Sequence, residues 1–152
     1  MTMPILFALA VTLFAQHPDM KHRGAQAMGF DQDKTTHHFK LTADGGRIEV
    51  SVNDRADQAS LAAVRVHLKA IAAEFARGDF SKPFATHGEV PPGVSTMQQR
   101  RARMTVKYQE TPEGGRVTIA TSDPEALTAV QAFLRYQITE HGTGDPLTVR
   151  AR

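Results

Sequence analysis

Histidine and methionine are the side chains of this sequence best suited to bind a transition metal. The 152 residues contain seven histidines, six methionines and no cysteine. The absence of cysteine excludes disulfides, thiolate metal sites, iron–sulfur clusters, covalent haem attachment and cysteine nucleophiles. Imidazole nitrogen and thioether sulfur remain, and both suit copper or the axial positions of haem iron.

Three histidines stand at positions that the apolar pattern directs into a core. In the strand that runs into Phe39, alternation places His37 on the inward face and His38 on the outward face, so the pair cannot bind one ion. His67 flanks the apolar stripe of a helix, and His141 ends a second helix. An inward imidazole needs a hydrogen-bond partner or a metal ion, so each is either a satisfied core histidine or a ligand. His141 also suits the negative end of a helix dipole.

Further candidate ligands lie outside the periodic segments. His87 precedes Met97 in a long connecting segment, and His17, Met20 and His22 stand near the N-terminus. The N-terminal group could bind copper through side chains and a free amine, or could be a solvated chain end. The predicted metal ligands are His37, His67, His87, Met97, His17, Met20 and His22.

Three classes of function fit these residues. The first is copper binding for storage, delivery or resistance. The second is noncovalent haem binding, with His37, His67 or His87 as one axial ligand and Met97 as the other. The third is a metal-free module whose open sheet face or long connecting segment docks a protein or a glycan. No GxSxG motif, HExxH motif or phosphate-binding glycine loop is present. These absences do not decide whether the protein is an enzyme, and the sequence leaves enzymatic activity open.

The elements that position these residues form two similar halves, residues 37–76 and 104–142. Each half contains a GGR turn between alternating strands, at Gly45 and Gly114, and then an amphipathic helix. The order ββα-ββα predicts an α+β fold: a four-stranded antiparallel sheet with two helices on one face, a permuted relative of the ferredoxin-like order. Residues 37–152 therefore form one domain, and residues 146–150 can add an edge strand.

Alignment of the halves shows that histidine in one half is replaced by an apolar residue in the other. The segment AVRVHL aligns with AVQAFL, and the hairpins align at their GGR turns. The corresponding pairs are His37 with Val106, His67 with Phe133, and His141 with Phe75.

The N-terminal region predicts export. Residues 4–15 form an apolar run that is too short to span a bilayer and fits a secretory signal. We therefore expect a signal peptide over residues 1–15, a flexible segment over 16–36, and a periplasmic or secreted protein. An uncleaved anchor or a buried N-terminal helix is the alternative.

The connection between the halves, residues 77–103, is far longer than an ordinary loop. It ends in a basic run whose Arg100, Arg101 and Arg103 could contact an anionic surface. The formal net charge of +2 is too small to indicate a nucleic-acid partner. The sequence leaves the oligomeric state open.

The segment MGFDQDKTTHHF, followed by the GGRIEV hairpin, resembles a group of small, uncharacterised exported bacterial proteins. The resemblance covers most of the chain after the predicted signal peptide. It implies export and supports the domain boundaries, and it carries no activity, cofactor or catalytic residue.

Overall fold

The computed structural model describes residues 18–149 and their side chains from residue 22 onward. The predicted signal peptide, His17 and the side chain of Met20 lie outside the described residues. The first hairpin joins β1 (Thr35–Thr42) to β2 (Gly45–Val52). The second joins β3 (Met104–Thr111) to β4 (Gly114–Thr121).

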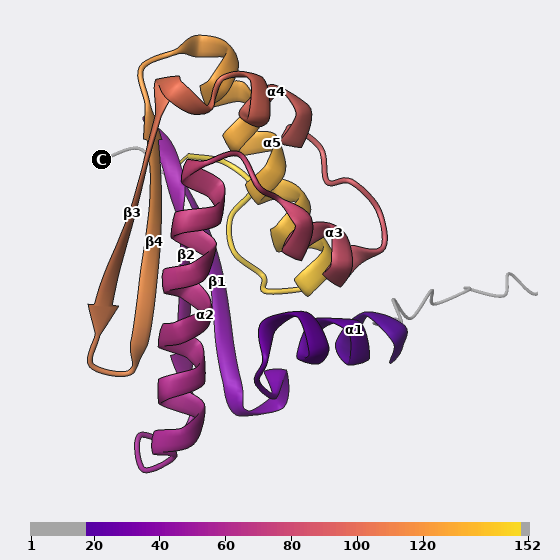
Figure 1. Ribbon diagram of the computed structural model, residues 1–152, viewed down its shortest axis with the longest axis vertical. Helices are drawn as coiled ribbons and strands as arrows, with labels where there is room; N and C mark the ends of the chain where they lie inside the picture. The colour runs from indigo at the N-terminus through magenta and orange to yellow at the C-terminus, as the bar shows by residue number, and fades with distance from the viewer. Residues whose placement is uncertain (1–17, 150–152) are drawn as a thin grey trace, which may run out of the picture.

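The two hairpins form one four-stranded antiparallel sheet with the order β1-β2-β4-β3 (Figure 1). The predicted α+β fold with this sheet is confirmed. Its relation to the ferredoxin-like order stays a prediction. Because β2 and β4 are central, β1 and β3 are the edge strands.

The repeated glycine pairs allow the two central strands to approach closely. A Cβ at Gly45 would lie 2.1 Å from the carbonyl oxygen of Ile119, and one at Gly114 would lie 1.9 Å from that of Val50. Neither distance leaves room for a side chain. The GGR segments are therefore required by the pairing of β2 with β4 as well as by the turns.

Helices α2 (Gln58–Ala76) and α5 (Pro124–His141) cover one face of the sheet, as predicted. Asp57 accepts a hydrogen bond from a backbone N–H at the start of α2, and Asp123 does the same for α5. These side chains satisfy donors that the first helical turn leaves free. Gly142, in the left-handed region, ends α5.

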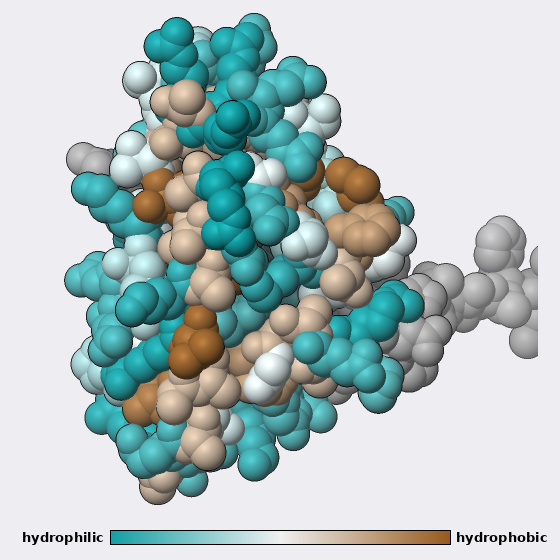
Figure 2. All heavy atoms as spheres, viewed as in Figure 1, coloured by the Kyte–Doolittle hydropathy of each residue, from teal (hydrophilic) through white to brown (hydrophobic). Residues whose placement is uncertain are grey.

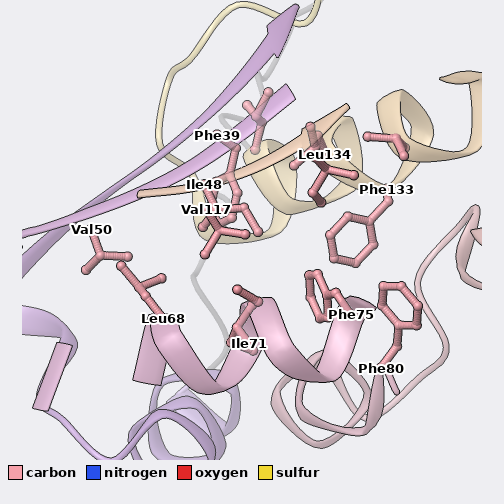
Figure 3. Close-up of a cluster of buried hydrophobic side chains, with 14 of the residues drawn as sticks. Phe39, Ile48, Val50, Leu68, Ile71, Phe75, Phe80, Val117, Phe133 and Leu134 are labelled. Carbon is pink, nitrogen blue, oxygen red and sulfur yellow. The ribbon is translucent and has the colours of Figure 1, made fainter. Parts of the chain in front are cut away.

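The core lies between this helical layer and the sheet. Figure 3 shows strand residues facing helix residues across it, with Phe75, Phe80 and Phe133 packed together at one end. The rings of Phe75 and Phe80 are stacked with centroids 4.5 Å apart, and Phe133 meets Phe75 edge to face at 5.8 Å. Burial of these large apolar side chains supplies most of the stabilisation of the fold.

The segments outside the repeat contain helices that the sequence did not predict. Residues 16–36 were expected to be flexible, but residues 18–28 form α1 (Pro18–Met28) and residues 32–34 a 3₁₀ turn, η1 (Gln32–Lys34). The reason is tertiary contact, because α1 packs on α3 and Phe30, just after α1, is buried in the core.

The long connection folds as α3 (Ser81–His87), α4 (Val94–Gln99) and a 3₁₀ turn, η2 (Arg101–Arg103). The predicted edge strand over residues 146–150 is wrong for residues 146–149, which form no strand. Among the described residues, no helix combines the length and apolar character needed to cross a membrane. On the face shown in Figure 2, hydrophobic side chains form small groups between hydrophilic ones.

Candidate functional site

Four histidines from four different elements line one cavity, which we call the histidine cavity. They are His37 of β1, His67 of α2, His87 at the end of α3 and His141 at the end of α5. The cavity measures about 50 Å³. That volume holds a few water molecules or a metal ion, and is far too small for a porphyrin.

The backbone directs each imidazole to this place. His37 lies between Thr35 and Phe39 on the helix-covered face of β1, as alternation predicted. His87 and His141 are the last residues of their helices, and a glycine in the left-handed region follows each. Figure 1 shows α3 beside the C-terminal end of α5, which explains how two helix ends meet.

The rings form a contiguous group. His141 stacks on His37 with centroids 5.6 Å apart and planes 13° apart, and meets His87 at 5.2 Å with planes 88° apart. Phe30 stacks on His37 at 5.9 Å and meets His67 edge to face at 5.5 Å. Every imidazole of the cavity is therefore in contact with another aromatic ring of this group.

Burial keeps these imidazoles neutral. Desolvation, with a smaller effect of His38, lowers the pKa of His37 to about 4. Desolvation, helped by the charge of Lys82 and by His37, lowers the pKa of His67 to about 4. Desolvation, helped by His37 and His87, lowers the pKa of His141 to about 3.

His87 follows the same trend. Desolvation lowers its pKa, although its hydrogen bond to Gln137 acts in the opposite direction. Near neutral pH all four rings of the cavity therefore carry no charge, and a neutral imidazole has one nitrogen whose lone pair can accept a proton or a metal ion.

One hydrogen bond fixes the orientation of His87. Its Nε2 donates to Oε1 of Gln137 at 2.9 Å, so Nδ1 carries the lone pair. That Nδ1 is buried and has no hydrogen-bond partner among the described residues, and the same is true of Nε2 of His37 and Nε2 of Gln137. Buried polar atoms without partners are costly. Of these three, the imidazole nitrogens can bind a metal ion, whereas the amide nitrogen of Gln137 is a donor only.

The structure brings together three of the predicted site residues, His37, His67 and His87. Met97 is fully buried in α4 and does not line the cavity. Met97 was expected to lie opposite a histidine as the second axial ligand, and the structure does not place it there. The reason is that α4 packs against α5 away from the cavity. Met28, at the end of α1, supplies the thioether that lines the cavity instead. His22 is exposed on α1 and contacts Gln26 at 3.2 Å.

Sequence reasoning omitted two residues of the site. His141 was identified as inward but was not included among the ligands, and Gln137 was missed. The alignment of AVRVHL with AVQAFL places Gln137 opposite Ile71, so the same comparison of halves that flagged the histidines would have found it. Gln137 is only 4% exposed.

Within the part of the chain that the structure describes, no group of three or more histidine, cysteine, aspartate or glutamate side chains is arranged to hold a metal ion. The histidine cavity therefore offers pairs of imidazoles and not a preformed three-ligand site. A haem would require the helices around the cavity to separate.

The two candidate surfaces are partly occupied by internal pairs. On the open sheet face, Glu49 pairs with Lys40 at 2.5 Å and with Arg116 at 2.8 Å. In the basic run, Arg100 pairs with Asp123 at 3.1 Å and with Glu125. Docking of a protein or a glycan on the open sheet face, and contact of the basic run with an anionic surface, stay predictions.

The chain matches no protein-family model, no curated protein and no solved structure. The site must therefore be interpreted from its own geometry.

Proposed function

We propose that the protein binds one copper ion, as Cu(I), in the histidine cavity, and that it serves copper storage, delivery or resistance outside the cytoplasm. The proposal rests on the hydrogen bonding of the two ring nitrogens of His87. Its Nε2–H is held by Gln137 while its buried Nδ1 has no partner. A histidine that binds a metal through one nitrogen commonly donates the other N–H to an oxygen in this way.

The spacing of the rings supports a shared ion. Two imidazoles that bind one ion at metal–nitrogen distances of about 2.0–2.1 Å and a near-tetrahedral angle, as a third ligand such as a thioether imposes, place their ring centroids about 5 Å apart. The centroids of His87 and His141 lie 5.2 Å apart. His37 stacks on His141 at 5.6 Å, so it becomes a third ligand only after its ring rotates.

The composition of the cavity favours Cu(I) over zinc. Zinc sites use three or four protein ligands in a fixed arrangement, whereas Cu(I) is stable with two imidazoles and accepts a soft thioether. The cavity has paired imidazoles and the sulfur-bearing Met28. Neutral rings also bind copper without first losing a proton near neutral pH.

Calorimetric titration of the purified protein with Cu(I), Cu(II) and Zn(II) tests the proposal. We expect one Cu(I) per chain, bound more tightly than Zn(II). His87→Ala and His141→Phe should each lower the Cu(I) affinity at least tenfold, about 1.4 kcal/mol. His37→Val should lower the affinity less, because its ring binds only after rotation, and His67→Phe, whose ring contacts Phe30, should lower it least; neither should lower the melting temperature.

Two further variants test the preference for Cu(I) and the location of the site. Met28→Leu should weaken Cu(I) binding and leave Zn(II) binding unchanged, because only Cu(I) favours the thioether. His22→Gln is the control, since that histidine is exposed on α1 outside the cavity. No uptake of copper in either oxidation state, or equal loss in His22→Gln and His87→Ala, would refute the proposal.

A further inference from the structure

A second polar pocket, which we call the edge pocket, lies against the outside of the histidine cavity. It measures about 250 Å³ and is formed by η1, β1 and the turn after α5. His37 and His141 line both the edge pocket and the histidine cavity. These two stacked rings therefore form a shared wall between the cavity and the surface.

His38 also lines the edge pocket, although it lies on the opposite face of β1 from His37. Its ring is held in place, because Nδ1 donates a hydrogen bond to Oδ1 of Asp145 at 2.9 Å. The side chain of His38 is 43% exposed and that of Asp145 only 9%. The ring is thus reachable from solvent, while the carboxylate that orients it is not.

Asp145 is itself fixed by neighbouring donors. Its Oδ2 accepts the backbone N–H of Phe39 at 3.0 Å and the hydroxyl of Thr143 at 2.7 Å. An ionised carboxylate behind an exposed imidazole attracts cations and leaves Nε2 of His38 as the free ligand atom.

We propose that His38 is the first ligand that an incoming copper ion meets, and that rotation of the His37 ring away from His141, on which it stacks, lets the ion pass from the edge pocket into the histidine cavity. This inference rests on the proposed copper function. His38 cannot share the final site with His37, because adjacent residues of a strand point to opposite faces. Its place is therefore on the path of the ion and not at the end of that path.

A residue on the path has a kinetic signature that a final ligand lacks. Loss of a transient ligand raises the barrier for uptake and for release equally, so both rate constants fall by one factor and Kd is unchanged. Loss of a final ligand instead weakens Kd, mainly through faster release.

The test is stopped-flow transfer of Cu(I) from a coloured chelator to the purified protein, with release followed by the reverse transfer. We expect His38→Gln to slow uptake and release at least tenfold each, with Kd within twofold of the wild-type value. Asp145→Asn should slow both steps less, because it keeps the ring and weakens its orientation. Lys69→Gln, at an exposed position of α2 outside both pockets, is the control and should have wild-type rates.

Three results would overturn the inference. Unchanged rates in His38→Gln would show that copper takes another path, and a weakened Kd would show that His38 belongs to the final site. In both cases copper binding by the wild-type protein, and its loss in His87→Ala, would leave the proposed function intact. Absence of copper uptake by the wild-type protein would refute the proposed function and the path together.

Discussion

Replacing His37 by valine should change how the stability of the fold depends on pH. Burial lowers the pKa of this imidazole from 6.5 to about 4, so the folded protein resists a proton that the unfolded chain accepts. The stabilisation is fully present above pH 6.5 and is lost as the pH falls toward 4. Valine, which stands at the equivalent position 106, has no proton to bind.

The magnitude follows from the two pKa values. At about pH 5 the unfolded imidazole is largely protonated and the folded one is largely neutral. Relative to about pH 7.5, His37 then lowers the free energy of unfolding by about 2 kcal/mol. This value is an upper limit, because part of the ring reaches the edge pocket and is solvated there.

Urea unfolding of the wild-type protein and His37→Val, with a metal chelator present at both pH values, measures this difference. Between about pH 7.5 and pH 5 the wild type should lose up to about 2 kcal/mol more than the variant. His22→Gln removes an exposed histidine and should follow the wild type. If His37→Val and the wild type lose equal stability, the ring is not desolvated in the folded state and the account of the cavity is wrong.

Three other predictions concern single contacts. Gln137→Ile removes a buried amide nitrogen without a partner but leaves Nε2–H of His87 without its acceptor, so the free energy of unfolding in urea should change by less than about 1 kcal/mol while calorimetry shows weaker copper binding. Unchanged copper affinity would contradict the role of Gln137. Asp123→Ala removes the cap of α5 and should lower the free energy of unfolding by about 1 kcal/mol; no loss would show that the cap is unimportant. Gly114→Ala places a Cβ 1.9 Å from a β2 carbonyl oxygen and should cost at least about 2 kcal/mol in thermal unfolding; a wild-type melting temperature would contradict the close approach of β2 and β4.

The repeated elements could be predicted because their signals are local. Alternation identified both hairpins, and apolar residues at helical spacing identified α2 and α5. The start of α5 was readable from Asp123 followed by proline, and its end from Gly142. Alternation also placed His37 toward the helices before any contact was known.

The rest of the site depends on contacts between distant segments. Helix α3 contains Pro83, has no side-chain cap at Phe80 and is only seven residues long, so it has little stability of its own. Its position against α5 places His87 beside His141, 54 residues later in the chain. Which methionine lines the histidine cavity, Met97 or Met28, could not be predicted either, because the answer depends on where α4 and α1 pack.

The comparison of the two halves shows why packing alone does not account for the cavity. At equivalent positions of the two halves, Val106, Phe133, Phe75 and Ile71 correspond to His37, His67, His141 and Gln137. The same ββα unit is therefore compatible with an apolar residue at each place. Each buried polar atom without a partner costs about 1–3 kcal/mol, and such atoms belong to His37, His87 and Gln137. An ion that binds the folded state and not the unfolded chain offsets this cost. The unpaired atoms thus make the empty cavity destabilising, and on the proposed function a copper ion bound to the imidazoles would offset the part of this cost that belongs to the histidines.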